Sequence, residues 1–369
     1  MWQQNKMEHV NQSTLENLKP MELPPLPGNP LVSVLIANYN YAQYIGEAIE
    51  SVLNQTYQNF EIVICDDGST DNSLEVIRRY AERDSRIKYI AKENGGVASA
   101  LNECLRIAQG QIGCFLDADD RFKPDKIEAV VKSLSGSTDE GMVIHPLHVI
   151  NPYGRRVRSL PIPRKLDSGW LAPTVLRNFG SWLCPPASGI SFRRDVITKI
   201  LPIPEELKKN ADGYVMFGLP LLTKVVSLPI PLADYRLHGK NVTGLGWASP
   251  EVIEYTVTLR LYLRKAVLGK LGIDINFDDE ELVRGLAEPI VLYYLQTGRT
   301  LPLLTNSAID MRKPLSFLYG KKQYYIYRAL FFLPPRLNLF IIRQWHSNMG
   351  LKKMSDYIRL ILIRLRKGW

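Results

Sequence analysis

The feature that most constrains this chain is a regular alternation of short apolar runs and amphipathic stretches between residues 31 and 149. The run Leu31-Val32-Ser33-Val34-Leu35-Ile36 is rich in β-branched residues, and the stretch after it repeats apolar side chains at helical spacing between Ile45 and Leu53. Further apolar runs lie at 60–65, 87–90 and 111–116. Strands that alternate with helices predict βαβ units, so we expect an α/β fold with a mainly parallel central sheet.

Polar clusters follow these predicted strands. They are Ala37-Asn38-Tyr39-Asn40, Asp66-Asp67-Gly68-Ser69-Thr70-Asp71, Asn94-Gly95-Gly96 and Asp117-Ala118-Asp119-Asp120. Ligands of open α/β sheets collect at the carboxyl ends of the strands, and the clusters after the first, second and fourth strands fall on that edge. The sequence therefore predicts a binding site at this edge.

Asp117 and Asp119 carry the strongest chemical signal in the chain. Two carboxylates two residues apart can share a hard divalent cation, while phosphate oxygens and water take the other coordination positions. The alternative is a solvated acidic turn that caps the helix expected from Pro124. Asp-Gly-Ser and Asn-Gly-Gly are also common in plain turns, and a lone histidine such as His238 is usually structural.

Local signals place helix ends and domain boundaries. Ser69, Thr70 or Asp71 is available to cap one helix, and Gly110 stops the next. Further on, we expect a helix with Ser249 as its cap, Pro250 at its first position and Gly269 at its end, and a second helix over 278–295. The predicted organisation is a polar arm and proline-rich linker at 1–30, an α/β domain at 31–244 with halves at 31–120 and 121–244, and a helical C-terminal region at 245–369.

Composition and charge bear on location and partners. The four cysteines are widely spaced and no apolar block has signal-peptide or membrane-spanning length, which favours a reduced, cytoplasmic protein. The net charge of +9 belongs to the tail, because residues 311–369 hold 13 Lys and Arg against one acid. In its last run Ile358, Ile361, Leu362 and Leu365 share one helical face, which suits a helix lying on an anionic membrane surface. The alternative is a helix packed on the α/β domain; no nucleic-acid-binding signature accompanies the basic residues.

Five ordered segments resemble the family 2 glycosyltransferases. They are Val34-Leu35-Ile36-Ala37-Asn38-Tyr39-Asn40, Ile64-Cys65-Asp66-Asp67-Gly68-Ser69-Thr70-Asp71, Asn94-Gly95-Gly96 with Asn102, Phe115-Leu116-Asp117-Ala118-Asp119-Asp120, and Tyr235-Arg236-Leu237-His238-Gly239-Lys240-Asn241. The last segment is similar to the Tyr-Arg-x-His-x-x-Asn element of that family. The resemblance covers about 210 residues and implies the GT-A fold with a helical C-terminal extension, and an inverting, metal-dependent transfer of a sugar from a nucleotide diphosphate to an acceptor hydroxyl. It also implies that 31–244 is the catalytic domain, with a nucleotide-binding half at 31–120 and an acceptor and sugar half at 121–244.

The resemblance also implies roles for individual residues. Asp119 would bind Mn²⁺ or Mg²⁺ directly, Asp117 would touch the ribose or the water shell of the metal, and His238 would complete the metal or diphosphate site. The donor site would be lined by Ala37, Asn38, Tyr39, Asp66, Asp67, Asn94, Gly95, Gly96, Asp117 and Ala118. The cation would neutralise charge that builds up on the departing diphosphate.

Inversion requires one base to take the proton of the acceptor hydroxyl. Relatives usually have a Glu-Asp pair before the Tyr-Arg-x-His element, where this chain has Ala211-Asp212. We therefore expect Asp212 to be the base, with Glu205 or Glu206 as the fallback and a helix-capping Asp212 as the structural alternative. Leu101 stands where relatives often have Arg. Trp182, Pro185, Ser188 and Gly189 lie where such enzymes shape the sugar and acceptor pockets.

Two competing enzyme classes are disfavoured because the motifs that they require are missing. A sugar nucleotidyltransferase needs a glycine-rich basic loop after the first strand, and a dinucleotide-binding dehydrogenase needs G-x-G-x-x-G there; Ala37-Asn38-Tyr39-Asn40 is neither. The Gln-x-x-Arg-Trp element of processive synthases is missing, so single addition is favoured. A sugar-nucleotide-binding protein that has lost turnover, and a membrane-attached scaffold, remain as rivals. We expect a UDP-sugar donor, a glycan or lipid-linked glycan acceptor, and a peripheral position on the inner face of the cell membrane.

Overall fold

The computed structural model describes residues 17–157, 166–177, 180, 182–238, 241 and 250–273. The chain divides into two compact units. The first consists of 1–157, 162–242 and 262–276, and it holds every strand of the described residues. Of the second unit the structure describes only 250–261, the first part of a long helix. The second helix that we predicted, at 278–295, and the basic tail lie outside the described residues.

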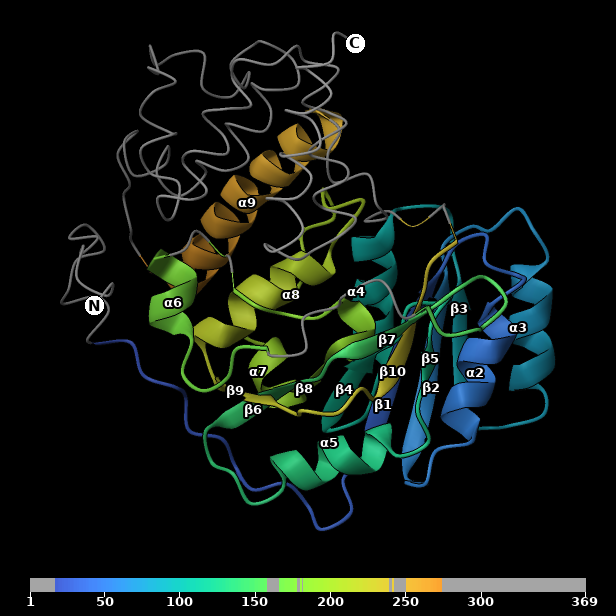
Figure 1. Cartoon of the computed structure of the whole chain (residues 1–369), viewed down its shortest axis with the longest axis horizontal. Coiled ribbons are helices and arrows are strands. Elements are labelled where there is room, and N and C mark those ends of the chain that lie inside the picture. Colours follow the sequence, from blue (N-terminus) through green and yellow to red (C-terminus); the bar gives the residue numbers. More distant parts are fainter. Residues whose placement is uncertain are drawn as a thin grey trace, which may run out of the picture. The chain divides into compact units, whose positions relative to one another are not determined.

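A seven-stranded sheet forms the centre of the first unit (Figure 1). Its strand order is β3-β2-β1-β4-β8-β6-β9. The strands are β1 (Val32–Asn38), β2 (Phe60–Asp66), β3 (Ile87–Ala91), β4 (Ile112–Phe115), β6 (Glu140–Ile144), β8 (Ile190–Arg193) and β9 (Lys224–Ser227). β1 to β4 run parallel, as predicted, whereas β8 is antiparallel to both of its neighbours, β4 and β6. The sheet is therefore mainly parallel with one reversed strand.

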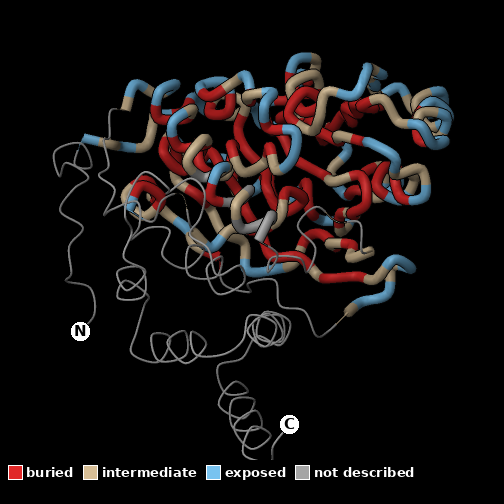
Figure 2. The backbone as a smooth tube through the Cα atoms, turned by 90° about the horizontal axis from the view of Figure 1, so that it is seen from above, coloured by how far each residue is buried: buried red, intermediate tan, exposed pale blue. Residues whose placement is uncertain are grey.

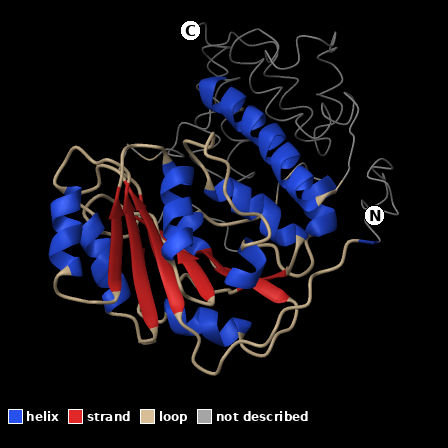
Figure 3. Ribbon diagram, turned by 180° about the vertical axis from the view of Figure 1, so that it is seen from behind, coloured by secondary structure: helices blue, strands red, loops and turns tan. Residues whose placement is uncertain are grey.

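Helices cover both faces of this sheet because side chains alternate along each strand (Figure 3). Val32, Val34 and Ile36 belong to a buried cluster with apolar residues of α2 (Ile45–Leu53), α3 (Ser73–Ala81) and α5 (Lys126–Leu134). On the opposite face α4 (Val97–Ile107) packs against β1 and β2, where the Cys104 Sγ lies 3.5 Å from the carbonyl oxygens of Ile36 and Val63. Figure 2 shows the buried segments in the interior and the exposed ones at the outer turns.

A second, three-stranded sheet has the order β5-β10-β7. It is formed by β5 (Arg121–Phe122), β7 (Leu147–Ile150) and β10 (Ala233–Arg236). β10 pairs antiparallel with β5, which follows the acidic cluster directly, so a segment more than 110 residues downstream lies beside that cluster. The remaining helices are α6 (Ala172–Arg177), η1 (Ala187–Gly189), α7 (Arg194–Ile197), α8 (Asp212–Gly218), η2 (Leu219–Leu221) and α9 (Pro250–Leu271).

Helix ends lie within a few residues of the predicted signals. α4 ends at Ile107, with Ala108 as its C-cap, so Gly110 is not the residue that stops it. α9 begins at Pro250 as expected but continues past Gly269 to Leu271, where Gly272 at φ +65° ends it and the Ile273 N–H bonds to the Leu268 carbonyl. In α3 the N-cap position belongs to Asn72, which makes no side-chain cap bond. Asp71 instead accepts from the Ser73 N–H at 2.9 Å.

Residues 20–30, which we expected to act as a stiff linker, pack along the domain. The N–H groups of Met21 and Leu23 bond to the carbonyls of Leu222 (2.8 Å) and Thr138 (2.7 Å), and Leu23 is only 4% exposed. The Tyr57 hydroxyl donates to the Pro30 carbonyl at 2.7 Å. Proline prevents this segment from forming a helix or a central strand but does not keep it off the surface of the domain. Among the described residues no helix is long and apolar enough to cross a bilayer.

Candidate active site

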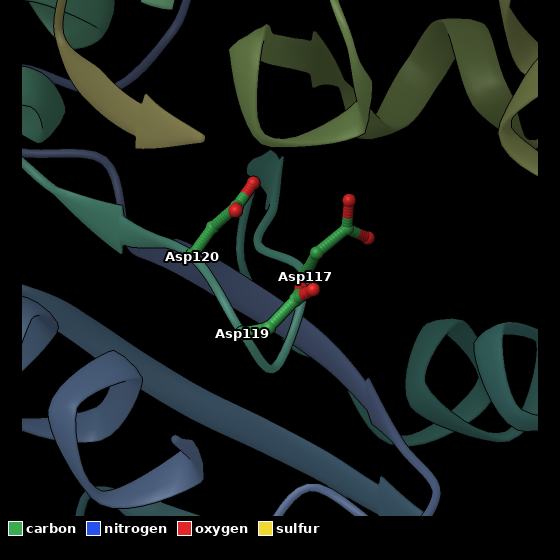
Figure 4. A group of neighbouring side chains, drawn as sticks. All are labelled: Asp117, Asp119 and Asp120. Atoms are coloured by element: carbon green, nitrogen blue, oxygen red, sulfur yellow. The ribbon is translucent and has the colours of Figure 1, made fainter. Parts of the chain in front are cut away.

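Three carboxylates lie together on the turn that follows β4 (Figure 4). One ligand oxygen from each of Asp117, Asp119 and Asp120 lies within 4.8 Å of the others. Asp119 and Asp120 are buried and Asp117 is half-buried. The turn is closed by a hydrogen bond from the Asp120 N–H to the Asp117 carbonyl at 3.0 Å. It does not cap α5, which starts at Lys126, with Asp125 at the N-cap position. The alternative of a helix-capping acidic turn is therefore wrong.

Asp120 is committed to internal hydrogen bonds. Its two carboxylate oxygens accept from the Ser188 hydroxyl (2.7 Å) and from the Arg236 N–H (2.8 Å). Burial raises the pKa of Asp120 well above its ordinary value, and the charges of Asp119 and Asp117 add to this. Asp117 and Asp119 are consequently the pair of this group best able to bind an external cation.

Asp117 is surrounded by negative charge. Burial raises its pKa well above the ordinary value, followed by the charges of Asp119 and of Asp212 at the start of α8. A cation would relieve this repulsion, and carboxylate oxygens are the ligands that Mn²⁺ and Mg²⁺ prefer. The donor set and its charge fit a hard divalent cation.

His238 lies against Asp119 although 119 residues separate them. Its Nε2 is 2.7 Å from Asp119 Oδ2, and the Asn241 amide lies 3.4 Å from the same oxygen. The His238 ring stacks on Tyr44, with centroids 5.2 Å apart, and meets the Tyr41 ring edge-on at 5.6 Å. The predicted grouping of Asp117, Asp119 and His238 is present in the structure.

Arg236 and Tyr41 are site residues to which the sequence analysis gave no role. Arg236 is fully buried; its Nε donates to the Asp119 carbonyl at 2.7 Å, and its guanidinium lies over the Tyr44 ring and pairs with Glu47. Burial raises the pKa of Tyr41, and the charges of Asp119 and Asp117 add to this. Arg236 stands inside the Tyr-Arg-x-His segment, and its place in that motif could have indicated a role in the site. No sequence signal indicated a role for Tyr41.

The polar clusters after β2 and β3 also come together. Asp66 accepts from the Asn38 amide (2.7 Å) and from the Ser69 hydroxyl and N–H. Asp67 accepts from Lys92 Nζ (2.7 Å) and from the N–H groups of Gly95 (2.9 Å) and Gly96 (2.7 Å). Both aspartates are nearly buried, so in this structure they fasten the loops that form the predicted nucleoside pocket.

The other predicted donor-site residues differ in exposure. Tyr39 is 46% exposed and Asn94 is exposed, whereas Ala37 is half-buried. Asn38 and Ala118 are buried, and Ala118 belongs to the apolar core cluster beneath the acidic turn. Ala118 therefore supports the turn through packing.

Asp212 is the first residue of α8 and is half-buried. Burial raises the pKa of its carboxyl group, while hydrogen bonding to backbone N–H groups at the helix start opposes this. The N-cap position belongs to Ala211, and Asp212 follows it as the first helical residue. Ala211 itself is fully buried. Glu205 and Glu206 are exposed, and Glu206 accepts from the Tyr262 hydroxyl at 3.0 Å.

Comparisons with known proteins agree with this geometry. Residues 33–200 match the family described as Glycosyl transferase family 2. An uncharacterized glycosyltransferase of Nostoc sp. is 40% identical over 212 residues, which cover 57% of this chain and 66% of the relative. The putative glycosyltransferase EpsH of Bacillus subtilis is 40% identical over 223 residues (58% of this chain, 62% of the relative). Chondroitin synthase of Pasteurella multocida is 41% identical over 125 residues (34% and 13%). The chain thus spans less than two thirds of the length of each of these relatives.

Among solved structures, S. aureus TarS 1-349 in complex with UDP-GlcNAc superposes with a TM-score of 0.52 at 15% identity, covering 85% of this chain and 91% of that one. The same protein in complex with UDP gives a TM-score of 0.50. This likeness shows the predicted GT-A fold. The matched segment and the curated relatives show that the chain carries a glycosyltransferase family 2 domain over residues 33–200.

Proposed function

We propose that this protein is an inverting, metal-dependent glycosyltransferase that moves a sugar from a nucleotide diphosphate to an acceptor hydroxyl. The observation that carries the proposal is the convergence of Asp117, Asp119, His238 and Asp212 from three distant parts of the chain. Family membership supports the reaction class. The geometry supports the division of the residues into a cation site and a base.

Asp119 and Asp117 are the proposed cation ligands, and His238 either completes the site or orients Asp119. Mn²⁺ or Mg²⁺ bound there supplies positive charge opposite the leaving diphosphate. The protein contributes the fixed geometry: Arg236 holds the Asp119 carbonyl, and Ser188 holds the Asp117 N–H at 3.0 Å. These internal bonds keep the two ligand carboxylates in place.

Asp212 is the proposed base. In an inverting transfer the acceptor oxygen attacks the anomeric carbon while the bond from that carbon to the diphosphate oxygen breaks, and the hydroxyl proton passes to the base. Burial raises the pKa of Asp212, which makes its carboxylate a stronger proton acceptor. Glu206 is a weaker candidate because it is exposed and already accepts a hydrogen bond from Tyr262.

The donor would enter over the Asp66-Asp67 and Asn94-Gly95-Gly96 loops, with Tyr39 exposed beside them. A UDP-sugar is the first donor to test, since TarS, which shares the fold, was solved with UDP and UDP-GlcNAc. For the acceptor we propose a glycan or lipid-linked glycan in the assembly of cell-surface polysaccharide or lipopolysaccharide. The cationic tail would hold the enzyme on an anionic cytoplasmic membrane surface, and the four free cysteines fit a reducing compartment.

The test is a calorimetric titration of UDP-, dTDP- and GDP-sugars with and without Mn²⁺, together with assays of transfer and slow donor hydrolysis. Asp119→Asn should abolish metal-dependent donor binding. Asp212→Asn should keep donor binding and lose turnover. Asp125→Asn is the matched control, because Asp125 is exposed and makes no side-chain cap bond on the neighbouring helix. It should leave both activities unchanged.

The outcomes separate the rival functions. If no nucleotide sugar binds under any metal condition, the transferase proposal fails. Donor binding without transfer to any of a panel of glycan acceptors, and without donor hydrolysis, would favour a binding protein that has lost turnover. The buried Ala211, where relatives usually have Glu, is the feature that such a protein would have.

A further inference from the structure

The segment Ile203–Asn210, called the strap below, runs along the N-terminal part of α4 and leads directly to the helix that begins with Asp212. We propose that Asn102 on α4 is a positioning residue, which acts through the strap to place Asp212 relative to the donor side of the site. This inference rests on the proposed function, in which Asp212 is the base.

Asn102 holds both backbone groups of Ile203. Its Nδ2 donates to the Ile203 carbonyl at 2.7 Å, and its Oδ1 accepts from the Ile203 N–H at 2.8 Å. A single amide side chain that donates and accepts in this way fixes both the position and the orientation of the peptide it meets. Ile203 and Leu207 are buried, at 0% and 4% exposure, so apolar packing holds the strap along its length.

Lys208 joins the strap to the glycine turn of the donor side. Its Nζ donates to the Gly95 carbonyl at 2.6 Å, and its carbonyl accepts from the Val97 N–H at 3.3 Å. A Cβ on Gly96 would lie 2.8 Å from the Lys208 Cα, so the two backbones are in close contact. The N–H groups of Gly95 and Gly96 bind Asp67. The predicted nucleoside loop and the strap therefore meet at one turn.

The end of the strap is the start of the base-bearing helix. Asn210 adopts a left-handed conformation (φ +54°), and its carbonyl accepts from the Gly213 N–H at 3.0 Å. The Tyr214 hydroxyl of α8 donates to the Ile200 carbonyl at 2.8 Å, which closes the loop from 200 to 214 at its base. With the base closed, the contacts of Asn102 and Lys208 and the packing of Ile203 and Leu207 together orient the loop relative to α4. Loss of the Asn102 contacts would shift Asp212 without removing any donor contact.

The experiment compares Asn102→Ala with Lys208→Ala and with a matched control, Gln55→Ala, in the full chain. Gln55 is a buried amide that, like the half-buried Asn102, both donates to and accepts from backbone groups: it donates to the Lys123 carbonyl at 2.7 Å and accepts from the Ile127 N–H at 3.0 Å, but it lies away from the strap. Asn102→Ala should lower kcat by about ten- to a hundredfold, since a displacement of roughly 1 Å has that effect. The Kd of a UDP-sugar with Mn²⁺ should stay within about twofold, because the donor contacts are unchanged. Gln55→Ala should lose a similar amount of Tm and keep kcat.

Lys208→Ala removes an exposed side chain and does not threaten folding. It should lower kcat by a smaller factor, because the backbone contacts of Lys208 remain. If both Asn102→Ala and Lys208→Ala keep the kcat of the wild type, the inference is overturned while the proposed function stands.

A double-mutant cycle shows whether Asn102 acts through Asp212. In the Asp212→Asn background, adding Asn102→Ala should leave the residual transfer rate unchanged, because the group that it positions is already lost. If the two effects multiply, Asn102 acts independently of Asp212 and the inference is wrong. A separate outcome concerns the function itself: full transfer by Asp212→Asn alone would remove the base assignment and the inference with it.

Discussion

Ser188 is the side chain on which the geometry of the acidic turn depends most directly. It is fully buried in η1, its hydroxyl donates to Asp120 at 2.7 Å, and it accepts from the Asp117 N–H at 3.0 Å. Ser188→Ala would leave the Asp117 N–H and one oxygen of the buried Asp120 carboxylate without this partner. A neutral hydrogen bond contributes about 1 kcal/mol and one to a charged group about 1.5–3 kcal/mol, so the free energy of unfolding should fall by about 2.5–4 kcal/mol.

Urea unfolding followed by tryptophan fluorescence would measure this loss, with an unchanged m-value as the sign that the unfolded state is unaffected. Ser133→Ala is the matched control, because the Ser133 hydroxyl bonds only to the Ala129 carbonyl of its own helix among the bonds described. It should change stability by less than about 0.5 kcal/mol. A Ser188→Ala protein within that same range of the wild type would refute the assignment of Ser188 as the support of the acidic turn.

Three other changes have defined outcomes. Burial alone would raise the pKa of Glu61, but hydrogen bonds from Lys88 and its other donors outweigh burial and hold the pKa below the ordinary value. The ionised Glu61 therefore stabilises the folded state above about pH 4.3, and this contribution is lost as pH falls through the folded-state pKa. Glu61→Gln should therefore lose less stability than the wild type on acidification. If the urea midpoints of the two proteins fall by the same amount from pH 6 to pH 3, this expectation is wrong. Leu23→Ala should cost about 2–3 kcal/mol in urea unfolding, whereas a free linker would show no loss. Gly96→Ala places a Cβ at φ +89° and 2.8 Å from the Lys208 Cα, and should lower stability by about 2 kcal/mol or more in thermal unfolding; an unchanged Tm would argue against the close contact.

The first four strands could be predicted from the sequence because each is a local apolar run, almost wholly buried in β1, β2 and β4 and partly buried in the edge strand β3. β1, β2, β3 and β4 differ from the predicted ranges by no more than two residues at either end. Neighbouring parallel strands have their carboxyl ends on the same edge of the sheet, so the aspartates that follow β2 and β4 could be assigned to one edge from the sequence.

Long-range partners could not be predicted in the same way. Nothing in the local pattern around Ser188 indicates that its hydroxyl meets Asp120, 68 residues earlier, or that β8 enters the sheet antiparallel between β4 and β6. The proline-rich composition that led us to expect a linker gave no information on the surface against which Leu23 packs. His238 was expected at the metal or diphosphate site through the family motif alone, and the structure adds its contact with Asp119.

The strap has a consequence for building hybrids between relatives of this protein. The glycine turn at 94–96 and the segment leading to Asp212 share a backbone contact too close for a Cβ on Gly96, although more than 100 residues separate them in sequence. A donor loop grafted from another family member would lack the strap against which it packs in its own protein. Residues 92–102 and 203–212 are thus one unit of exchange, and a chimera that swaps only one of them should bind its new donor yet transfer slowly until the other is swapped as well.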